Sequence, residues 1–418
     1  MYIGQVLCKD ASTLYLPVCR RSAYELVVGN IDRALCPLQQ GQVDFDLYIL
    51  QHNISSNQQS ICIWSDNYLQ QYCVFADPQF DYGKGIVIIT TPARARYIFK
   101  TSSLMSNLPI STHKLLFRTK VSGNKGRGIF ANSHISAGSL ITQEAPIILI
   151  DDNWTINVSS EKARTTLEEL AIEKLPKLTR KTFHELYEGH DISNPWQKIY
   201  TNGYGVYGGP TNDWPELESE SDLGMVAVHA NISKINHGCR SNAAVQWDWD
   251  LLIHRLYAVR DIAADEEITI SYFNTIQTLQ ERQQYTKKYL GFACACNQCK
   301  ATGIFADLSD SRVNDIILLE KYLENEQIAP AEPVAMAELL VSLYKQEGLD
   351  PFISKAYAIA ALEWHGAGYE YQARSWAYQS VKAGLITTYG LGIEEYLNDM
   401  QTLLDRGRKH WSWRYRVH

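Results

Sequence analysis

The cysteines of this chain constrain its fold more than any other feature, because the nine of them are placed very unevenly. Five lie within the first 73 residues, the next is Cys239, and the last three lie close together near residue 300. An odd number of cysteines in a chain of 418 residues does not suit a disulfide scaffold. We expect the five N-terminal cysteines either to be buried as small apolar side chains or to pair in part as disulfides.

The three late cysteines favour a metal site. They are spaced as Cys294-x-Cys296-x-x-Cys299, directly after Phe292. Zinc prefers four tetrahedral ligands and binds thiolates at about 2.3 Å, so three thiols on one tight loop lack one ligand. A site of four thiolates predicts that Cys239, the only other cysteine in the C-terminal two-thirds of the chain, folds over this loop. A local disulfide and three free thiols are the alternatives.

Composition excludes several classes of protein. The chain has 46 acidic and 39 basic residues, a net charge of −7 and 45% apolar residues, which excludes a disordered or collagenous chain. Nucleic-acid binders depend on phosphate neutralisation, so we expect no direct nucleic-acid partner and favour a basic peptide. No apolar run reaches the roughly 18 to 20 residues that span a bilayer, and the N-terminus does not resemble a signal peptide. We expect an intracellular protein of the nucleus or cytoplasm, not a secreted or membrane protein; the oligomeric state is not predicted.

The N-terminal half reads mainly as short strands. Residues 1–112 are predicted to form a β-rich module of unknown role, whose clearest strand begins at Gly85. Short apolar runs between 115 and 150 alternate with glycine turns, which is typical of strands and tight turns. Residues 202–220 are expected to be a loop. Further strands are predicted to begin at Ala243, Leu252 and Glu267.

Helical spacing appears in two places. Residues 161–188 carry apolar residues at helical intervals that Pro176 interrupts, which predicts a pair of helices. After Cys299, apolar stripes predict a repeat-like stack of antiparallel helices, with glycines at helix ends. These helices are expected at 312–325, 333–347, 355–366, 369–383 and 391–406, and the glycines are Gly348, Gly384 and Gly407.

Two further motifs are weak when taken singly. Lys125-Gly-Arg-Gly is a Gly-x-Gly turn before a strand, which is more typical of a hairpin bend than of a ligand cradle. It lacks the strand–turn–helix setting of a dinucleotide fingerprint, so we exclude that class. Asn236-His-Gly-Cys places an amide, an imidazole and a thiol in succession, and His237 by itself is typical of a structural histidine.

Taken in order, four motifs resemble the SET-domain protein lysine methyltransferases. They are Lys125-Gly-Arg-Gly, Asn236-His-Gly-Cys, Glu267-Ile-Thr-Ile-Ser-Tyr272 and the cysteine-bearing tail that begins at Gly291. The likeness covers 113–150 and 223–300. The helical C-terminus is similar to that of a group of fungal SET proteins, and the layout resembles the SET and MYND family without its MYND finger.

The resemblance implies an α+β class and a β-rich SET fold with a threaded, knot-like segment. It divides the chain beyond residue 112 into a SET domain at 113–291 with a helical insertion at about 151–222. A post-SET zinc loop would follow at 292–305. Residues 306–418 would then form the helical repeat-like domain.

The family implies an enzyme that transfers methyl groups from S-adenosyl-L-methionine to a lysine of a protein or basic-peptide substrate, histones included. Tyr272 would be the catalytic channel tyrosine. The implied cofactor-binding residues are Lys125, Gly126, Arg127, Gly128, Asn202, Asn236, the backbone of His237, and Phe292. The implied zinc ligands are Cys239, Cys294, Cys296 and Cys299.

That chemistry suits these residue types. A lysine amine with a pKa near 10.4 is protonated at neutral pH, and burial in an aromatic channel lowers that pKa and frees the lone pair. The Tyr272 hydroxyl need only orient the amine and the methyl group. Acidic residues at 216–222 and 265–267 are expected either to dock a basic peptide or to lie in solvated loops.

The sequence departs from the family pattern at two positions. Gly238 and Ser241 stand where the family has a small hydroxyl residue and a proline. The alternative function is therefore a SET scaffold that serves as a binding module or acts on a small molecule.

Overall fold

The computed structural model describes residues 62–417 except for 67–69, 96–97, 99–114, 124, 189–194, 207–223, 250, 326–329 and 388–392. The chain divides into two compact units. The first unit contains the described residues of 1–114, together with 143–234 and 247–255. The second unit contains 115–142, 235–246 and the remainder from residue 256.

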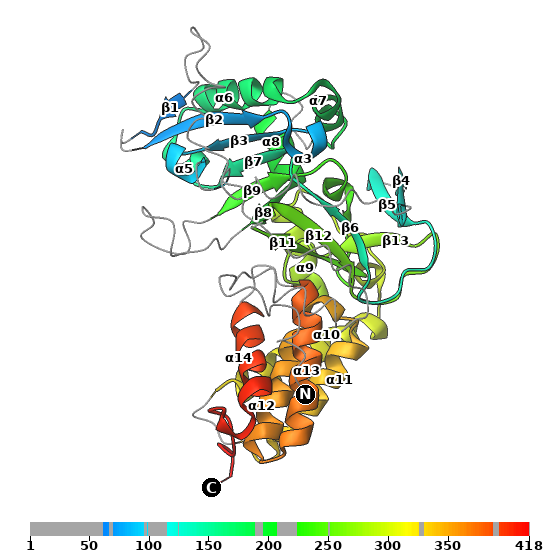
Figure 1. Ribbon diagram of the computed structural model, residues 1–418. Helices are drawn as coiled ribbons and strands as arrows, with labels where there is room; N and C mark the ends of the chain where they lie inside the picture. Colours follow the sequence, from blue (N-terminus) through cyan, green and yellow to red (C-terminus); the bar gives the residue numbers. More distant parts are fainter. Residues whose placement is uncertain are drawn as a thin grey trace. The chain divides into compact units, whose positions relative to one another are not determined.

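The first unit is built on a six-stranded sheet of order β1-β2-β3-β7-β9-β8 (Figure 1). Its strands are β1 (Cys62–Trp64), β2 (Gln71–Asp77), β3 (Ile86–Thr90), β7 (Ile148–Asp151), β8 (Gly203–Val206) and β9 (Met225–Val228). Only the β3–β7 pair is parallel. The described strands of the predicted N-terminal module therefore share a sheet with β7, β8 and β9, which begin more than fifty residues after Thr90, the last residue of β3.

A disulfide joins Cys62 and Cys73 in this sheet. The two residues are register partners on the antiparallel strands β1 and β2. Of the two expectations for the N-terminal cysteines, disulfide pairing is thus the outcome for this pair. Cys8, Cys19 and Cys36 lie outside the described residues.

Helices complete the first unit. They are α3 (Phe80–Gly83), α5 (Trp154–Asn157), α6 (Glu161–Lys174), α7 (Lys177–His184) and α8 (Pro195–Asn202). The predicted helix pair is confirmed, and Pro176 stands at the N-cap of α7, where its missing N–H costs no helical hydrogen bond. Leu167 and Phe183 pack with Ile89 and Ile150 of the sheet in one apolar core.

The predicted loop at 202–220 was wrong at its start, because residues 203–206 form β8. The glycines of this segment disfavour a strand on propensity alone. At Gly203, however, the neighbouring residues leave no room for a side chain. A Cβ on Gly203 would lie 2.3 Å from Cγ1 of Val226, its close neighbour on β9. Pairing with β9 therefore decides the conformation of this segment, and local propensity does not.

The second unit holds a four-stranded sheet of order β10-β13-β5-β4. The strands are β4 (Phe117–Val121), β5 (Arg127–Ala131), β10 (Asn236–His237) and β13 (Glu267–Ile270). The short β10 runs parallel to β13, and the other pairs are antiparallel. This sheet brings together three of the four motifs that the sequence singled out.

A further, three-stranded sheet has the order β11-β12-β6. Its strands are β6 (Leu140–Glu144), β11 (Ala243–Asp248) and β12 (Ile253–Ala258). The three lie where apolar runs predicted strands. Every residue of β12 is buried.

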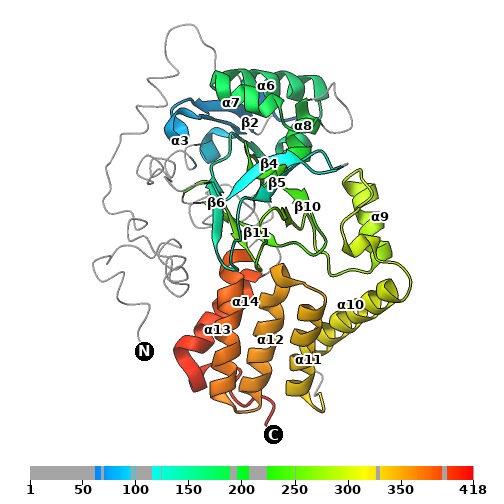
Figure 2. The ribbon, with the colours of Figure 1, turned by 90° about the vertical axis from the view of Figure 1, so that its right-hand side faces the viewer.

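The C-terminal part of the second unit is helical (Figure 2). Its helices are α9 (Leu279–Tyr289), α10 (Ile304–Leu323), α11 (Pro333–Gln346), α12 (Ile353–Gly366), α13 (Glu370–Thr387) and α14 (Ile393–Arg406). We name α10 to α14 the helical array. Each of its five helices overlaps one of the five predicted ranges, and buried Leu340, Ala356 and Ile359 lie in its main core. The remaining short turns are 3-10 helices, η5 (Ile232–Lys234), η6 (Gln298–Lys300), η7 (Asp350–Phe352) and η8 (Gly407–Lys409).

Two of the three glycines expected at helix ends behave as expected. Gly348 follows α11 with φ of 62°, and Gly407 follows α14 with φ of 51°. Gly384 instead lies inside α13, which corrects the prediction. A Cβ there would lie 2.8 Å from Oγ of Ser354 on α12, so this glycine permits close packing of the two helices.

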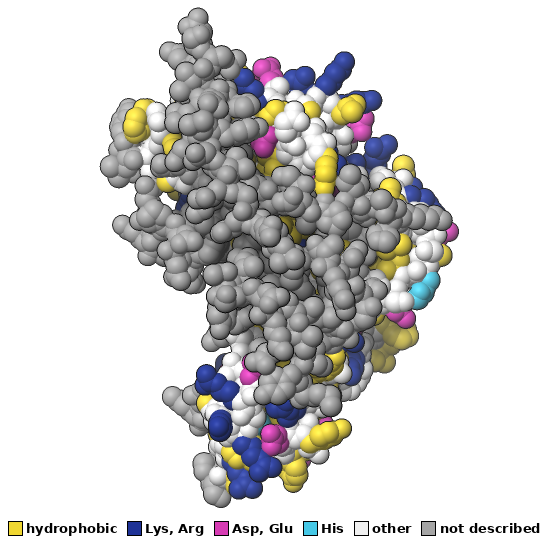
Figure 3. Space-filling model, viewed as in Figure 1, with side chains coloured by type: hydrophobic (Ala, Val, Ile, Leu, Met, Phe, Trp, Pro, Cys, Tyr) yellow, Lys and Arg dark blue, Asp and Glu magenta, His cyan; other side chains and the backbone are white. Residues whose placement is uncertain are grey.

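On the face shown in Figure 3, Lys and Arg side chains gather over the helical array at the lower end of the view. Across the described residues, no helix combines the length and the apolar character needed to cross a bilayer.

Candidate methyltransferase site and cysteine cluster

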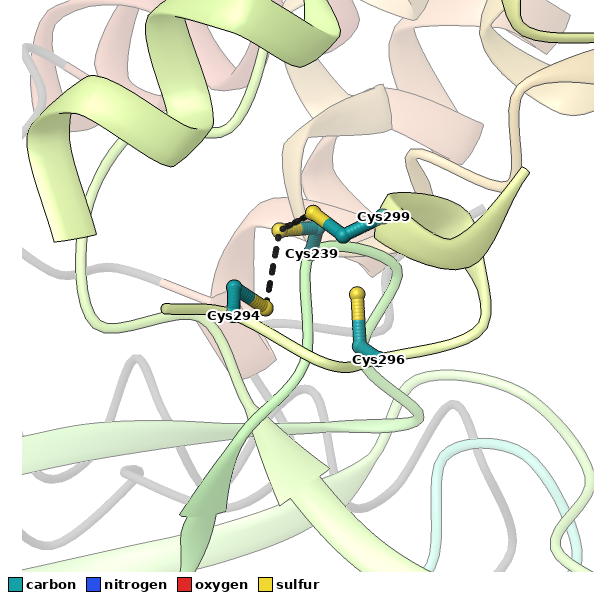
Figure 4. Close-up of side chains that lie close together, drawn as sticks. All are labelled: Cys239, Cys294, Cys296 and Cys299. Atoms are coloured by element: carbon teal, nitrogen blue, oxygen red, sulfur yellow. Dashed lines mark hydrogen bonds between the residues drawn. The ribbon is translucent and has the colours of Figure 1, made fainter. Parts of the chain in front are cut away.

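Four cysteines converge in the second unit (Figure 4). Cys239 follows β10, and Cys294, Cys296 and Cys299 follow α9. The Sγ atom of Cys239 lies 3.8 Å from that of Cys294 and 3.5 Å from that of Cys299. All four sulfur atoms lie within 4.8 Å of one another. The predicted convergence of Cys239 with the late trio is therefore confirmed.

The sulfur geometry fits zinc. Four thiolates at about 2.3 Å around a tetrahedral ion have neighbouring sulfur atoms about 3.8 Å apart. The observed separations from Cys239 are 3.8 and 3.5 Å. Soft thiolate sulfur with no carboxylate oxygen is the donor set of a structural zinc site.

The thiols also constrain one another's ionisation. Hydrogen bonds with the other three sulfur atoms raise the pKa of the Cys239 thiol well above its ordinary range. The hydrogen bonds that Cys296 accepts from its neighbours lower the pKa of that thiol. Four like groups at this spacing cannot all be thiolates without a cation among them, which is what a bound Zn²⁺ would supply.

Helix α9 and the turn after it hold the cysteine loop. The helix begins with a capping box in which Thr278 and Glu281 bond reciprocally. The side-chain amide of Gln283 donates to the carbonyl of Cys294 at 2.8 Å. The backbone N–H of Phe292 donates to the carbonyl of Thr286 at 3.2 Å. The position of the loop thus depends on α9, a helix that the sequence analysis did not predict.

His237 connects the cysteine cluster to Tyr272. Its Nε2 lies 3.2 Å from Sγ of Cys239, and its Nδ1 accepts the backbone N–H of Tyr272 at 3.2 Å. Burial lowers the pKa of His237 to about 4, so the ring is neutral at pH 7. Because Nδ1 accepts, this hydrogen-bond network assigns the ring proton to Nε2, which points at the sulfur. From the sequence, only the backbone of His237 was expected to belong to the site.

Tyr272 lies over the same segment. Its hydroxyl donates to the carbonyl of Ile235 at 2.5 Å, and its ring centroid is 5.3 Å from that of His237. Tyr272 as a whole is 43% exposed, but desolvation of its hydroxyl, with a smaller contribution from the Glu267 carboxylate, raises the pKa of the phenol above its ordinary value. The hydroxyl is therefore protonated at neutral pH and acts as a hydrogen-bond donor and acceptor, not as a base. The side chain of Phe292, predicted to cover a cofactor, lies with its ring 6.2 Å from that of His237.

Lys125 and Asn236 meet on one carboxylate. Nζ of Lys125 lies 3.0 Å from Oε2 of Glu267, and Nδ2 of Asn236 donates to Oε1 at 2.8 Å. The Ser122 hydroxyl donates to the same Oε1 at 2.5 Å. Burial opposes the charge of Glu267, but these hydrogen bonds outweigh it and lower the pKa of the carboxyl. Glu267 thus lies at the centre of this cluster, although its sequence context predicted only an acidic patch.

The glycine turn is the hairpin between β4 and β5. Gly126 has φ of 78°, and its carbonyl accepts the backbone N–H of Ser122 at 2.8 Å. A Cβ on Gly128 would lie 2.7 Å from Nδ2 of Asn236 and from Oε1 of Glu267, so a side chain here would displace those two groups. Arg127 is exposed, and its carbonyl accepts from Asn236 at 3.3 Å. The hairpin bend therefore also forms one wall of the Lys125–Asn236–Glu267 cluster.

Asn202 is the one predicted site residue that belongs to the first unit. Its side chain is buried, and its Nδ2 donates to the carbonyls of Tyr187 and Lys198 at 2.7 and 2.8 Å. These bonds close the C-terminal end of α8. Its contact with a cofactor stays a prediction.

The acidic residues at 265–267 are paired with neighbouring bases. Asp265 bonds to Arg118, and its Oδ1 lies 3.4 Å from Nζ of Lys120. Glu266 accepts from Arg260 at 2.7 Å, and Glu267 is engaged as described. Because these ion pairs neutralise the three carboxylates, the patch attracts a basic peptide only weakly. The other predicted acidic patch, 216–222, lies outside the described residues.

The two departures from the family pattern have structural reasons. A Cβ on Gly238 would lie 2.8 Å from Oγ1 of Thr269, so a serine at this position would clash. The backbone N–H of Gly238 donates to Ile270 at 2.9 Å, which fixes the loop without a side chain. Ser241 is buried and its hydroxyl lies 3.2 Å from that of Ser271, a hydrogen bond that a proline could not make.

Comparison with known proteins agrees with this geometry. Residues 126–273 match the SET domain family model. The histone-lysine N-methyltransferase set5 of Schizosaccharomyces pombe is 29% identical over 178 residues, which cover 42% of this chain and 48% of that protein. The histone-lysine N-methyltransferase SMYD3 of Homo sapiens is 34% identical over 83 residues, which cover 20% of this chain and 19% of that protein. The chain thus matches less than half the length of each of these curated relatives.

Among solved structures, the SET domain of LSMT bound to lysine and AdoHcy matches with 13% identity and a TM-score of 0.24. The match covers 78% of this chain and 95% of that one. The residues that match the family model include Gly126, the Asn236–Cys239 segment and Tyr272, and the match begins directly after Lys125. Over residues 126–273, this chain is thus similar to the SET domain.

Proposed function

We propose that this chain transfers a methyl group from S-adenosyl-L-methionine to a lysine side chain of a protein. The observation that carries the proposal is the five-residue segment 235–239. Ile235 binds the Tyr272 hydroxyl, Asn236 meets Lys125 through Glu267, and Cys239 joins the cysteine cluster. The groups that we propose for substrate, cofactor and metal therefore share one short piece of backbone in the second unit.

The residues proposed to hold the cofactor are Lys125, Gly126, Arg127, Gly128, Asn236, the backbone of His237 and Phe292, all of the second unit. When bound, S-adenosyl-L-methionine would supply an electrophilic methyl group on a sulfonium. The carboxylate of Glu267 already orders Lys125 and Asn236, so little side-chain entropy remains to be lost on binding.

The proposed role of Tyr272 is orientation. Its hydroxyl is protonated and directed to the Ile235 carbonyl, so hydroxyl and carbonyl together form a fixed dipole pair. A substrate amine next to them would be held by its hydrogen bonds with its lone pair in line with the methyl carbon. Alignment and fixed dipoles of this kind supply much of the rate of a group transfer. The aromatic rings of Phe273 and Phe292 beside His237 would lower the pKa of that amine by desolvation.

We propose that Cys239, Cys294, Cys296 and Cys299 hold one Zn²⁺ with a structural role. The ion would tie the segment after β10 to the loop after α9, and thus fix Phe292 two residues before the first late ligand.

We further propose a protein or basic-peptide substrate, histones included because the relatives are named histone-lysine N-methyltransferases. A histone substrate would place the protein in the nucleus or cytoplasm.

The test is a methylation assay with radiolabelled S-adenosyl-L-methionine and histones or cell extract. Tyr272→Phe is expected to lower kcat about 100-fold, the scale of losing one fixed hydrogen-bond donor at a reacting centre. Because the ring and its packing remain, bound zinc and cofactor affinity are expected to stay unchanged. Tyr378→Phe, an exposed tyrosine of α13, is the matched control and should retain wild-type kcat.

Three outcomes would contradict the proposal in whole or in part. A wild-type chain that binds the cofactor but labels no protein would favour the scaffold function. Equal kcat for wild type and Tyr272→Phe would remove the tyrosine from the reaction. A cofactor-binding chain that instead labels a small molecule would retain the chemistry and overturn the substrate class.

A further inference from the structure

A buried carboxylate of the helical array lies behind the cysteine cluster. Glu347 follows α11 as its C-cap, and its side chain is 1% exposed. Its Oε2 lies 2.8 Å from a guanidinium nitrogen of Arg240, and its Oε1 lies 2.7 Å from Nε of Arg312. The buried Ser309 hydroxyl donates to Oε2 at 2.8 Å. One carboxylate therefore collects donors from α10 and from the loop after β10.

The contact with Arg240 leads directly to Cys239. A second guanidinium nitrogen of Arg240 donates to the carbonyl of Cys239 at 2.8 Å and to that of Thr275 at 3.2 Å. The Thr275 hydroxyl donates to the same Cys239 carbonyl at 2.9 Å. Because Glu347 holds one end of the guanidinium, the other end is fixed on the backbone of a cluster residue.

The same carboxylate also reaches the second cysteine-bearing segment. The side-chain amide of Gln298, the residue before Cys299, donates to the Ser309 hydroxyl at 2.6 Å. It also lies 3.4 Å from Oε2 of Glu347. Arg240 and Gln298 come from segments almost sixty residues apart, and Glu347 is the partner that they share.

The electrostatics favour a charged and rigid network. Burial opposes ionisation of Glu347, but hydrogen bonds from Arg240, Ser309 and Arg312 outweigh it and lower the pKa of the carboxyl. Charge-assisted hydrogen bonds are stronger and shorter than neutral ones, and removing one partner leaves buried charge without compensation. The side chain of Arg240 is 12% exposed, so water cannot fully replace the lost carboxylate.

We propose that Glu347 is a positioning residue of the metal site, which holds the Cys239 and Cys299 segments at the separation that one ion requires. This inference rests on the proposed zinc site. It makes the helical array a structural part of that site and not only a surface for partners. Groups behind metal ligands that orient them change metal affinity by about 10- to 100-fold when they are removed.

The test compares zinc release from Glu347→Gln and Glu363→Gln in the full chain. Glu363 of α12 is the matched control because its side chain is 2% exposed and carries a buried ion pair with Arg416 at 2.8 Å. Among the described residues, its hydrogen bonds come from Tyr415 and Arg416. Zinc transfer to a chromogenic chelator is expected to be about tenfold faster for Glu347→Gln than for wild type. Glu363→Gln is expected to match wild type within about twofold.

A second variant keeps the test decisive if Glu347→Gln does not fold. Arg240→Gln breaks the same path from the other end and should speed release by a similar factor, and the double variant should add little to either change. If wild type holds one zinc per chain and both single variants release it at the wild-type rate, the role of Glu347 is wrong while the metal site stands. If wild type holds no zinc, the proposed metal site itself is wrong.

Discussion

At the scale of single residues, two buried glutamates show how surroundings set ionisation. Glu347 has two guanidinium partners, and the pKa of its carboxyl is lowered. Glu168 of α6 is fully buried, accepts only from Nε1 of Trp154 at 3.2 Å, and its Oε2 has no hydrogen-bond partner among the described residues. Burial raises the pKa of Glu168 to about 7. The number of charged donors, not burial alone, decides which carboxylate keeps its charge.

Glu168→Gln is therefore expected to change how stability depends on pH. The folded-state pKa of about 7 exceeds the ordinary value of 4.5, so the folded chain binds more protons and wild type loses stability as pH rises from about 4.5 to 7. Glutamine keeps the bond from Trp154 and carries no charge. The variant should unfold like wild type at pH 4.5 and be more stable at pH 8, by at most about 3 kcal/mol.

Urea unfolding at both pH values measures this difference. Glu169→Gln, the exposed neighbour on α6, is the control and should show no such pH dependence. A Glu168→Gln variant that is less stable than wild type at pH 8 would mean that the carboxylate is charged and has a partner.

At the scale of elements, α9 is a helix whose formation depends on its N-terminal cap and on tertiary contacts. Its stretch of Gln, Glu, Arg and Lys gives little apolar stripe, and only Arg282 and Thr286 are buried within it. The pattern Thr278-Leu-Gln-Glu281 was the local signal available, because a Ser or Thr with Glu three residues later marks a helix start. This helix matters because Gln283 and Thr286 bond to the cysteine loop.

Thr278→Ala is expected to lower the free energy of unfolding by about 1 kcal/mol, because it removes the side-chain acceptor for the N–H of Glu281. Urea unfolding measures it. Thr402→Ala inside α14 is the matched control, since its hydroxyl only donates to Asn398 and alanine favours the helix. Equal stability of Thr278→Ala and wild type would show that the cap contributes nothing to folding.

At the scale of the whole molecule, features that depend on residues close together in the sequence were predictable, and features that depend on distant residues were not. The five helices of the helical array were predictable because their apolar stripes repeat within a few residues. Strand β8 and the helical Gly384 were not, since each is decided by a neighbour more than twenty residues away, Val226 and Ser354. The only sign of such close packing in a sequence is the glycine itself. Because glycine is also common in turns, the sequence does not distinguish the two cases.

The site shows the same division. The meeting of Cys239 with the late trio was predictable because zinc chemistry demands a fourth ligand and Cys239 is the only other cysteine in the C-terminal two-thirds of the chain. The carboxylates of Glu267 and Glu347 were not, because their partners lie far away in sequence and acidic residues are common on solvated surfaces. For His237, only the backbone was expected to take part in the site. The contacts of its ring were not predictable, since no local pattern shows which groups face each ring nitrogen.

Because one cluster ties these distant segments together, metal removal is expected to act on the whole site. Phe292 lies two residues before Cys294, and His237 bonds both Cys239 and the backbone of Tyr272. Four thiolates without their cation repel one another, so the loop should open. Chelation is then expected to abolish binding of S-adenosyl-L-methionine in calorimetric titration, and added Zn²⁺ should restore it.

The disulfide gives the control for this experiment. The double variant Cys62→Ser, Cys73→Ser removes two sulfur atoms of the first unit and leaves the cluster intact, so it should keep one zinc per chain and wild-type cofactor affinity. A metal-free chain that binds the cofactor as tightly as the zinc-loaded chain would separate the two sites. In that case the cysteine cluster would stabilise the fold without fixing Phe292 and His237, and the coupling through residues 235–239 would be wrong.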